Sequence, residues 1–346
     1  SLVFQSDMSG SLFKDDDKLV DDYIKTVNDK VSEDNSETSI VDQFWNVLDE
    51  RDSKYSDLVP SGNSEYGKYQ GVDISNLNGD VDIKALKDNG INFVMIREIE
   101  AIDMDYANDH LDNLDYSWLE NVEKCVENDM PFGIFIYSRA TTENMARQEA
   151  VKVIKFLSKY NVRPDFPIYW DIEAQETEPL KDEENNFVNS RDFIYNNPEQ
   201  VVKNFKAFAE VLEKYGYYVG IYASDSVLNI IDPDGSKLKD YSVWAACYKY
   251  GEGGTQMDFY TNFDPITPDY PHVDMFQFSC TGLLSGNENH TIDCNLSLYN
   301  YAKIIHEKGL NIPLDYELYF GDNPKIYNPA NPPKKELHKF INIIYH

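Results

Sequence analysis

The chain has 346 residues, of which 31 are basic and 61 acidic, so its formal net charge is −30 and its pI is near 4.4. Nucleic-acid-binding proteins need clustered lysine and arginine, so this composition excludes nucleic acid as a partner. Hydrophobic residues make up 42% of the chain, with 25 Tyr and 18 Phe, which is enough for a sizeable folded core. No apolar run approaches the length of a membrane span, and none is expected.

The four cysteines form no CxxC pair, and no histidine lies at zinc-site spacing from them. We therefore expect no metal and no cofactor, and we interpret Cys125, Cys247, Cys280 and Cys294 as buried thiols. A disulfide between Cys280 and Cys294 stays open as an alternative, because both lie near the ends of predicted neighbouring strands. The acidic stretch 103–115 lacks the Gly and Glu spacing of a calcium loop and is interpreted as solvated.

The N-terminal segment 1–68 is acidic and rich in Asp and Ser. Apolar residues recur in it at helical spacing over 17–31 and 40–52, which predicts short amphipathic helices. The pattern changes after a turn-rich linker, and a main domain is predicted over 69–309. The remaining residues, 310–346, are rich in Pro and Asn and are predicted to form a C-terminal extension.

Short apolar runs alternate with longer amphipathic stretches through the first part of the main domain. Strands are predicted over 69–75, 91–98, 131–138, 167–173 and 217–223, and helices over 80–90, 117–130, 142–160 and 198–216. Three further strands, joined mainly by loops, and a closing helix are predicted over 241–248, 272–279, 290–295 and 295–309.

This strand-then-helix order predicts an α/β fold with a parallel sheet. Eight strands suit a TIM-like barrel in which the last three strands lack full helices, with N- and C-terminal appendages. A doubly wound open sheet is the alternative, although no GxGxxG motif follows the first strand. In a barrel of this kind, the chemistry is expected at the C-terminal ends of the strands.

The segment 167–173, PIYWDIE, places two acids at the end of a predicted strand. Alternate side chains of a strand share a face, so Tyr169, Asp171 and Glu173 are expected to point together into the barrel. Asp73 ends the first strand, and Asp293 is placed at the end of the last one. Strands one and eight are neighbours in a closed barrel, so we expect these four acids to meet in one cavity.

Crowded carboxylates cannot all ionise at their usual pKa values, because burial and like charges raise the pKa of at least one. A carboxyl group that keeps its proton near neutral pH is a general acid. Cleavage of a glycosidic bond needs such an acid for the leaving oxygen, together with a second group that stabilises the oxocarbenium-like transition state. The four acids therefore predict a glycoside-cleaving site.

At these residues the chain resembles the glycoside hydrolase family 25 lysozymes. The resemblance covers about residues 69–309 and is carried by GVDISNLNGDVDIKALKDNGINFVMIRE, PFGIFIYS, YWDIE, YVGIYAS, YSVWAACY, DMFQFSCTG and IDCN, in family order. It implies a barrel of the (β/α)5(β)3 type. It also implies hydrolysis of the β-1,4 bond between N-acetylmuramic acid and N-acetylglucosamine in bacterial cell-wall peptidoglycan.

The resemblance also implies roles for individual residues. Glu173 corresponds to the general acid and base, and Asp171 to the group that assists the substrate 2-acetamido group; Asp73 and Asp293 match the other acidic positions. Further binding or supporting groups at family positions are Arg97, Tyr137 and Gln277. Three aromatic residues are candidates for stacking on sugar rings, with core packing as the alternative: Tyr169, Tyr222 and Trp244.

Several positions depart from the family pattern. The family's Tyr-His-Phe after strand three is Tyr137–Ser138–Arg139 here, its Asp-Leu-Asn in the last strand is Asp293–Cys294–Asn295, and its Gln-Gly in the first loop is Asn78–Gly79. An acidic insertion, 174–198, follows the catalytic strand. We interpret the insertion as a solvated surface loop, with a segment that narrows the cleft or acts as a lid as the alternative.

Two other functions stay open at this stage. The barrel can be a weakly active or inactive wall-binding module of a larger wall-lytic assembly, such as a phage tail or a conjugation or secretion machine. It can also be an enzyme acting on chitin or another N-acetylhexosamine polymer. As a peptidoglycan hydrolase or as a wall-binding module, the protein is expected to act at the bacterial cell wall. It would reach the wall by export or by delivery within an assembly.

Overall fold

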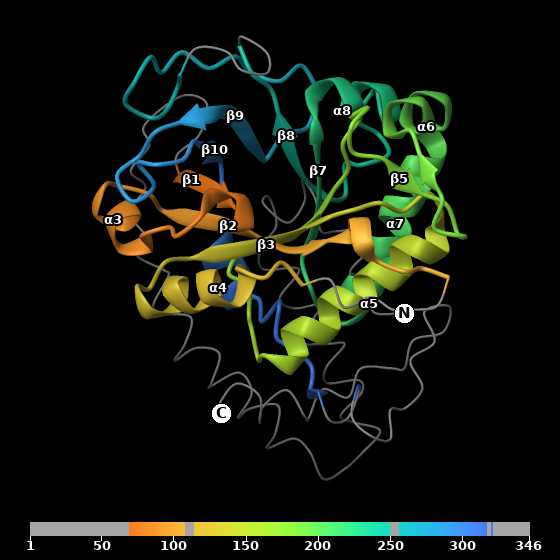
Figure 1. Ribbon diagram of the computed structural model, residues 1–346, viewed down its shortest axis with the longest axis horizontal. Coiled ribbons are helices and arrows are strands. Elements are labelled where there is room, and N and C mark those ends of the chain that lie inside the picture. The colour runs from red at the N-terminus through yellow and green to blue at the C-terminus, as the bar shows by residue number, and fades with distance from the viewer. Residues whose placement is uncertain (1–68, 108–113, 250–255, 317–319, 321–346) are drawn as a thin grey trace.

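A computed structural model describes residues 69–107, 114–249, 256–316 and 320. Within this part, eight strands close into a barrel in the order β1-β10-β9-β8-β7-β4-β3-β2, with helices along its outside (Figure 1). The α/β barrel predicted from the sequence is confirmed, and the open doubly wound sheet is wrong.

Some of the sequence-based expectations fall outside the described residues. The helices at 17–31 and 40–52 are among them, as are residues 108–113 of the acidic stretch and most of the C-terminal extension. Across the part that is described, no helix is both long and apolar enough to cross a membrane.

The element bounds follow the predicted order closely. The barrel strands are β1 (Tyr69–Ile74), β2 (Phe93–Glu100), β3 (Phe132–Tyr137), β4 (Ile168–Asp171), β7 (Val219–Ser224), β8 (Ser242–Ala246), β9 (Met275–Gly282) and β10 (Ile292–Ser297). The α-helices are α3 (Ile83–Asp88), α4 (Trp118–Glu127), α5 (Glu143–Lys159), α6 (Ser190–Asn196), α7 (Pro198–Lys214), α8 (Asp225–Ile231) and α9 (Tyr301–Glu307). A short 3-10 helix, η1 (Asn76–Asn78), follows β1, and β5 (Leu180–Lys181) pairs with β6 (Phe187–Val188) in a hairpin.

Seven neighbouring barrel strands, from β1 through β2, β3, β4, β7 and β8 to β9, are parallel. The last strand, β10, is antiparallel to both of its neighbours, β9 and β1. Each of the first five barrel strands along the chain is followed by a helix, the helix after the fifth strand being the short α8, which was not predicted from the sequence. The chain therefore has the five-plus-three order of the predicted barrel.

Capping groups fix where the two long covering helices begin. The Thr142 side chain accepts a hydrogen bond from the Met145 backbone at the start of α5, and α7 begins with Pro198, whose fixed φ suits the first helical turn. Both helices bury one apolar face against the strands and pack against each other. Gly216, with φ +81°, then turns the chain from α7 toward β7.

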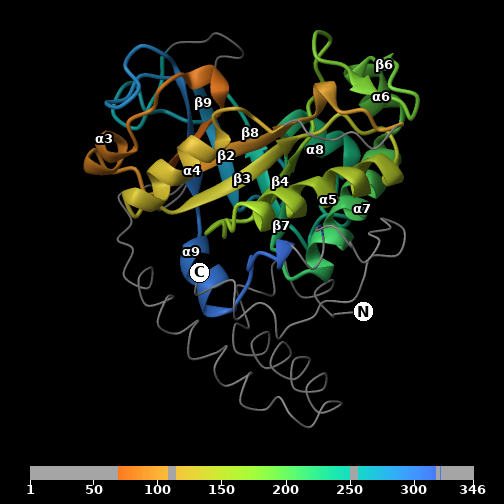
Figure 2. The same ribbon diagram turned by 60° about the horizontal axis from the view of Figure 1, so that its bottom comes forward.

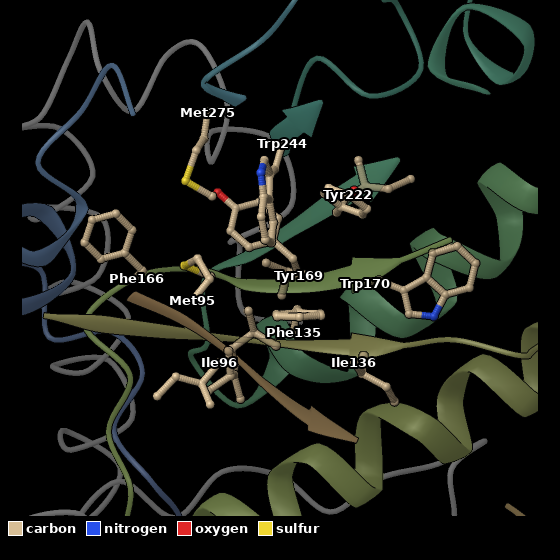
Figure 3. Packing of buried hydrophobic residues seen from close by; sticks show 14 of the residues in the cluster. Met95, Ile96, Phe135, Ile136, Phe166, Tyr169, Trp170, Tyr222, Trp244 and Met275 are labelled. Atoms are coloured by element: carbon tan, nitrogen blue, oxygen red, sulfur yellow. The ribbon is translucent and has the colours of Figure 1, made fainter. Parts of the chain in front are cut away.

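The barrel interior is a packed core of large and very small side chains. Phe135, Tyr169 and Trp244 lie between the strands, whereas Trp170 and Ile136 point outward toward the helices (Figure 3). Glycine makes room for the large rings. A Cβ atom on Gly71 would lie 2.2 Å from the ring of Phe93, and one on Gly220 would lie 2.4 Å from the ring of Tyr169. The interior of the barrel is therefore filled, and a site is expected at the C-terminal end of its strands.

The amino-terminal end of the barrel is closed by α9 and the residues after it. Tyr301 packs edge-on against Phe166 and Tyr218, with ring centroids 5.5 and 5.7 Å apart, and Leu310 and Leu314 join the core. In Figure 2, α9 lies at the opposite end of the barrel from α6 and the β5–β6 hairpin. The predicted helix over 295–309 starts too early, because β10 continues to Ser297 and α9 begins at Tyr301.

The insertion 174–198 is docked on the barrel, so its interpretation as a solvated loop is wrong. It forms the β5–β6 hairpin and α6, which lie together near the ends of α5 and α7 (Figures 1 and 2). Leu180 and Ile194 are fully buried. The Lys181 backbone N–H donates to the Arg139 carbonyl at 2.7 Å, and the Thr141 hydroxyl donates to the Lys181 carbonyl at 2.7 Å. These bonds join the insertion to the turn after β3.

No disulfide links the four cysteines, so the alternative pairing of Cys280 with Cys294 is wrong. In the β9–β10 register, Cys294 lies opposite Ser279. Cys280 is one residue further along, and successive side chains of a strand point to opposite faces.

Candidate active site

A cavity of about 340 Å³ opens at the C-terminal ends of the barrel strands. Nine of the ten predicted site residues line it, which brings the acids from three separate strands together. These nine are Asp73, Arg97, Tyr137, Asp171, Glu173, Tyr222, Trp244, Gln277 and Asp293. Other lining residues come from the first loop, the insertion and the loop before β10: Asn78, Gln175, Glu178, His290 and Thr291.

Strand β4 presents the two acids of the YWDIE motif as strand alternation predicts. Trp170 faces outward and packs against Phe205 and Phe208 of α7, with ring centroids 6.1 and 6.4 Å apart. Asp171 and Glu173 face the cavity from the opposite side of the chain. Asp171 is buried at the last strand position, and Glu173 is half-buried just beyond it.

Asp171 is a buried carboxyl group with one unsatisfied oxygen. Its Oδ1 has no hydrogen-bond partner within the described part of the chain. Burial raises the pKa of Asp171 well above its usual range, and the neighbouring charges of Glu173 and Glu100 raise it further. The Arg139 guanidinium opposes this shift. An N–H or O–H donor placed in the cavity would satisfy the oxygen and favour the ionised form.

Glu173 has the protonation behaviour of a general acid near neutral pH. Burial raises the pKa of Glu173 to about 7, and the charge of Glu178 adds to the effect. The Gln175 side-chain amide donates a hydrogen bond to Glu173 Oε2, and both this bond and Arg139 lower the pKa. A pKa in this range lets Glu173 hold a proton and release it near neutral pH.

Asp293 lines the cavity from the start of its strand, not from the end as expected. It lies near the start of β10 rather than at its end, which corrects the prediction. Because β10 is antiparallel to β1, its beginning lies at the same end of the barrel as the end of β1. The register places Asp293 directly opposite Asp73.

Asp73 accepts hydrogen bonds from two buried amides. Gln277 Nε2 donates to Asp73 Oδ2 at 2.7 Å and to Asp293 Oδ2 at 3.3 Å. Asn295 Nδ2 donates to the same Asp73 oxygen at 2.7 Å, and Trp244 Nε1 donates to Asn295 Oδ1 at 2.8 Å. Asp73 is thus held in one orientation at the floor of the cavity.

The two facing carboxyl groups share a proton more readily than they both ionise. Burial raises the pKa of Asp73 and raises that of Asp293 well above its usual range, and the Asp73 charge raises the Asp293 value further. A proton on Asp293 donates to Asp73, which favours the ionised form of Asp73.

Gln277 was predicted from the sequence, but its partner Tyr248 was not, nor was Asn295, which donates to Asp73 beside it. Gln277 Oε1 accepts hydrogen bonds from the Tyr222 hydroxyl at 2.9 Å and from the Tyr248 hydroxyl. Tyr248 and Asn295 were quoted only within motifs. The alternation signal was sufficient for Asn295, because it lies two residues after Asp293 and so shares its face.

The predicted stacking role of Tyr169 is wrong. Its side chain is fully buried below the cavity, where its hydroxyl bonds that of Ser242 at 2.8 Å. Trp244 and Tyr222 do line the cavity, with ring centroids 4.6 Å apart, and Tyr169 packs beneath Trp244 at 5.2 Å. Tyr169 therefore supports the floor formed by the other two.

Arg97, predicted as a binding or supporting group, forms ion pairs at the cavity edge, although not with one of the four acids. Its Nε lies 3.0 Å from Asp115 Oδ2, and its Nη1 lies 3.5 Å from Glu100 Oε2. Asp115 also accepts the Asn76 backbone N–H at 3.1 Å, and the Arg97 guanidinium donates to the Asn76 side chain. Arg97 thus fixes the loop after β1 at the cavity edge.

A fully buried acid behind the cavity, Glu149 of α5, had no signal in the sequence analysis. Its carboxylate accepts hydrogen bonds from Trp170 Nε1 at 2.8 Å, from the Tyr106 hydroxyl at 2.6 Å, and from both the Ser138 hydroxyl and the Arg139 backbone N–H. These contacts tie strand β4 to the turn after β3.

No group of three or more His, Cys, Asp or Glu side chains in the described part of the chain is arranged to hold a metal ion. The cavity acids instead contact side-chain amides and each other. The chemistry available from these residues is proton transfer and hydrogen bonding to a bound molecule.

Comparisons with known proteins agree with this barrel. The model of glycosyl hydrolases family 25 matches residues 72–287, which is more than half of the chain. The modular autolysin LytC from Streptococcus pneumoniae has a similar structure, with 20% identity and a TM-score of 0.50 over 68% of this chain and 47% of LytC. The catalytic domain of endolysin ply40 from bacteriophage P40 of Listeria monocytogenes matches with 21% identity and a TM-score of 0.50, over 71% of this chain and all of that domain (100%). The aligned part thus spans about half the length of LytC, and no curated protein matches the chain.

Proposed function

Because the chain belongs to glycosyl hydrolases family 25, we propose that it is a peptidoglycan hydrolase that acts at the bacterial cell wall. The bond that we assign is the β-1,4 bond from N-acetylmuramic acid to N-acetylglucosamine. One observation carries the proposal: a single cavity holds a half-buried Glu173 with a pKa of about 7 beside a buried Asp171 whose Oδ1 has no partner among the described residues.

In the proposed first step, Glu173 donates its proton to the glycosidic oxygen. The bond from that oxygen to the anomeric carbon breaks, and the carbonyl oxygen of the muramic acid 2-acetamido group forms a new bond to the same carbon. The glucosamine unit leaves with the proton on its 4-hydroxyl. This substrate-assisted route is a known exception to the scheme in which a carboxylate is the nucleophile.

Asp171 assists the acetamido group in this step. The acetamido nitrogen gains positive charge as the acetamido carbonyl oxygen attacks the anomeric carbon. A carboxylate that accepts the acetamido N–H therefore stabilises the transition state more than the ground state. The unsatisfied Asp171 Oδ1 suits this contact. Because Asp171 is buried away from bulk water, screening of the interaction is weak.

Water completes the proposed reaction. The Glu173 carboxylate takes a proton from a water molecule, whose oxygen attacks the anomeric carbon and displaces the acetamido oxygen. The product keeps its configuration at that carbon, and Glu173 regains its proton. Asp73 is proposed to bind sugar hydroxyls at the cavity floor, and its hydrogen bonds from Gln277 and Asn295 support this role.

The proposal predicts a fall in activity as pH rises through about 7, because the first step needs protonated Glu173. Initial rates of peptidoglycan solubilisation, measured from about pH 5 to about pH 9 at constant ionic strength, would show this alkaline limb. An activity that stays constant across this range would contradict the role of Glu173.

The net charge of −30 predicts that activity first rises with ionic strength, because the protein and an anionic wall repel each other at low salt. Lysis rates between about 0.01 M and about 0.15 M salt would measure the effect. A steady fall in rate from the lowest salt concentration would contradict this electrostatic argument.

The function itself is tested by assaying new reducing ends after incubation with purified peptidoglycan and, separately, with chitin. Release from peptidoglycan alone is the expected result. Release of reducing ends from chitin alone would instead support an enzyme that acts on chitin or another N-acetylhexosamine polymer. Binding to cell walls without release from either polymer would support a wall-binding module.

A further inference from the structure

We propose that Arg139 and Glu178 are positioning residues for the reaction, forming a charged pair that sets the electrostatic environment of Glu173. Arg139 comes from the turn after β3, and Glu178 from the insertion 174–198. The inference rests on the proposed function, in which Glu173 is the proton donor. It gives the insertion a part in the reaction.

Arg139 is buried, with only 3% of its surface exposed, and its side chain is held by contacts on several sides. Its Nη2 and Nε donate to Glu100 Oε1 at 2.9 and 3.1 Å, and its Nη1 donates to the Pro179 carbonyl at 3.2 Å. Glu178 Oε2 lies 3.5 Å from Arg139 Nη2. The guanidinium carbon also lies 4.0 Å from the centre of the Tyr137 ring, which lines the cavity.

The backbone around Arg139 is fixed by a buried acid. Glu149 accepts the Arg139 backbone N–H at 3.1 Å and the Ser138 hydroxyl at 2.9 and 3.0 Å. The Arg139 carbonyl accepts the Lys181 N–H from the insertion. The turn that carries the guanidinium therefore has little freedom to move.

Glu178 is held between two anchored parts of the insertion. On one side, the Gln175 backbone N–H donates to the Ser190 hydroxyl at 2.8 Å, and the Gln175 side chain bonds Glu173. On the other side, Lys181 Nζ donates to the Met104 carbonyl at 3.0 Å. Glu178 itself lines the cavity, with 45% of its side chain exposed.

The two charges act on Glu173 in opposite directions. The Glu178 carboxylate raises the pKa of Glu173, and the Arg139 guanidinium lowers it. Arg139 acts in the same sense on Asp171. Among the described residues, the other titratable groups that interact with Glu173 through charge or hydrogen bonding are Tyr137, Asp171, Tyr222, Tyr248 and Asp293.

Opposite shifts of the alkaline limb of the pH–rate profile test the proposal. Glu178→Gln removes the like charge and is expected to move the limb down by roughly half a pH unit. Arg139→Gln removes the opposite charge and is expected to move the limb up, whereas Arg139→Lys, which keeps the charge, is expected to restore it toward the wild-type position. A purely structural role would lower the rate without such opposed shifts.

Glu176→Gln is the matched control, because Glu176 lies in the same insertion and makes an exposed ion pair with Arg191. Its profile is expected to match the wild type. Shifts of Glu178→Gln and Arg139→Gln in the same direction, or no shift in either, would overturn the proposal. If Arg139→Gln does not fold, the comparison of Glu178→Gln with Glu176→Gln decides. An active Glu173→Gln protein would instead overturn the proposed function.

Discussion

Glu173→Gln should reduce peptidoglycan hydrolysis by about 10³-fold or more, because an amide has the shape of the acid but no proton to transfer. Glu173 is half-buried at the cavity and its side chain contacts Gln175, so the substitution is not expected to change the fold. The rate of turbidity loss of purified peptidoglycan measures the effect. Thermal unfolding within a few degrees of the wild type would show that the fold is kept.

The control for this experiment is the same substitution at an exposed neighbour. Glu176→Gln changes the net charge equally, and its carboxylate lies on the surface beside Arg191. It should keep wild-type activity. Full activity in Glu173→Gln would refute the assignment of the proton donor and, with it, the proposed mechanism.

Asp171→Asn should lower the hydrolysis rate by about 10²-fold or more and, at neutral pH, make the folded protein more stable by about 1–2 kcal/mol. The rate falls because a neutral amide stabilises the charged acetamido group less than a carboxylate does. The stability rises because Asp171 is a buried acid with one unsatisfied oxygen, and ionising it inside the protein is costly.

The direction of this stability change follows from the raised pKa of Asp171 in the folded state. Such a group contributes its full stability below the pKa of the unfolded chain, and this contribution is lost as pH rises through the folded-state pKa. The advantage of Asp171→Asn should therefore grow with pH and disappear below about pH 4. Urea unfolding across this range measures it. A variant that is less stable than wild type at neutral pH would contradict the interpretation that ionised Asp171 destabilises the folded protein.

Strand alternation was enough to predict that Asp171 and Glu173 lie together at the cavity. The rule that side chains two apart share a face placed Asp171 and Glu173 together, and the barrel then placed both at the C-terminal end. The same rule misled for Tyr169. It gives the face of a side chain but not its depth, and the lower positions of a barrel strand are filled by the core.

The antiparallel direction of β10 could have been predicted from the sequence but was missed. A parallel connection needs a crossover of a dozen or more residues. Only residues 283–291 separate β9 from β10, which is too short for a crossover. The antiparallel direction moves Asp293 from the end of its strand to the start, and it stays in the site because both neighbours run the other way.

The docking of the insertion could not be read from its pattern. Acidic residues such as Glu183 and Glu184 are exposed at the hairpin turn and dominate its composition, whereas the buried anchors Leu180 and Ile194 are few and far apart. The bond from Lys181 to Arg139 joins two backbone groups, and backbone pairing between distant segments leaves no mark on composition.

The most direct test of the central claim is the identity of the sugar at the new reducing end. Peptidoglycan digested by the wild-type protein is reduced with borohydride, hydrolysed to its sugars and analysed by mass spectrometry. The mechanism through Glu173 and Asp171 predicts that muramic acid is recovered as its sugar alcohol. Recovery of glucosamine as the alcohol, with muramic acid unreduced, would contradict it.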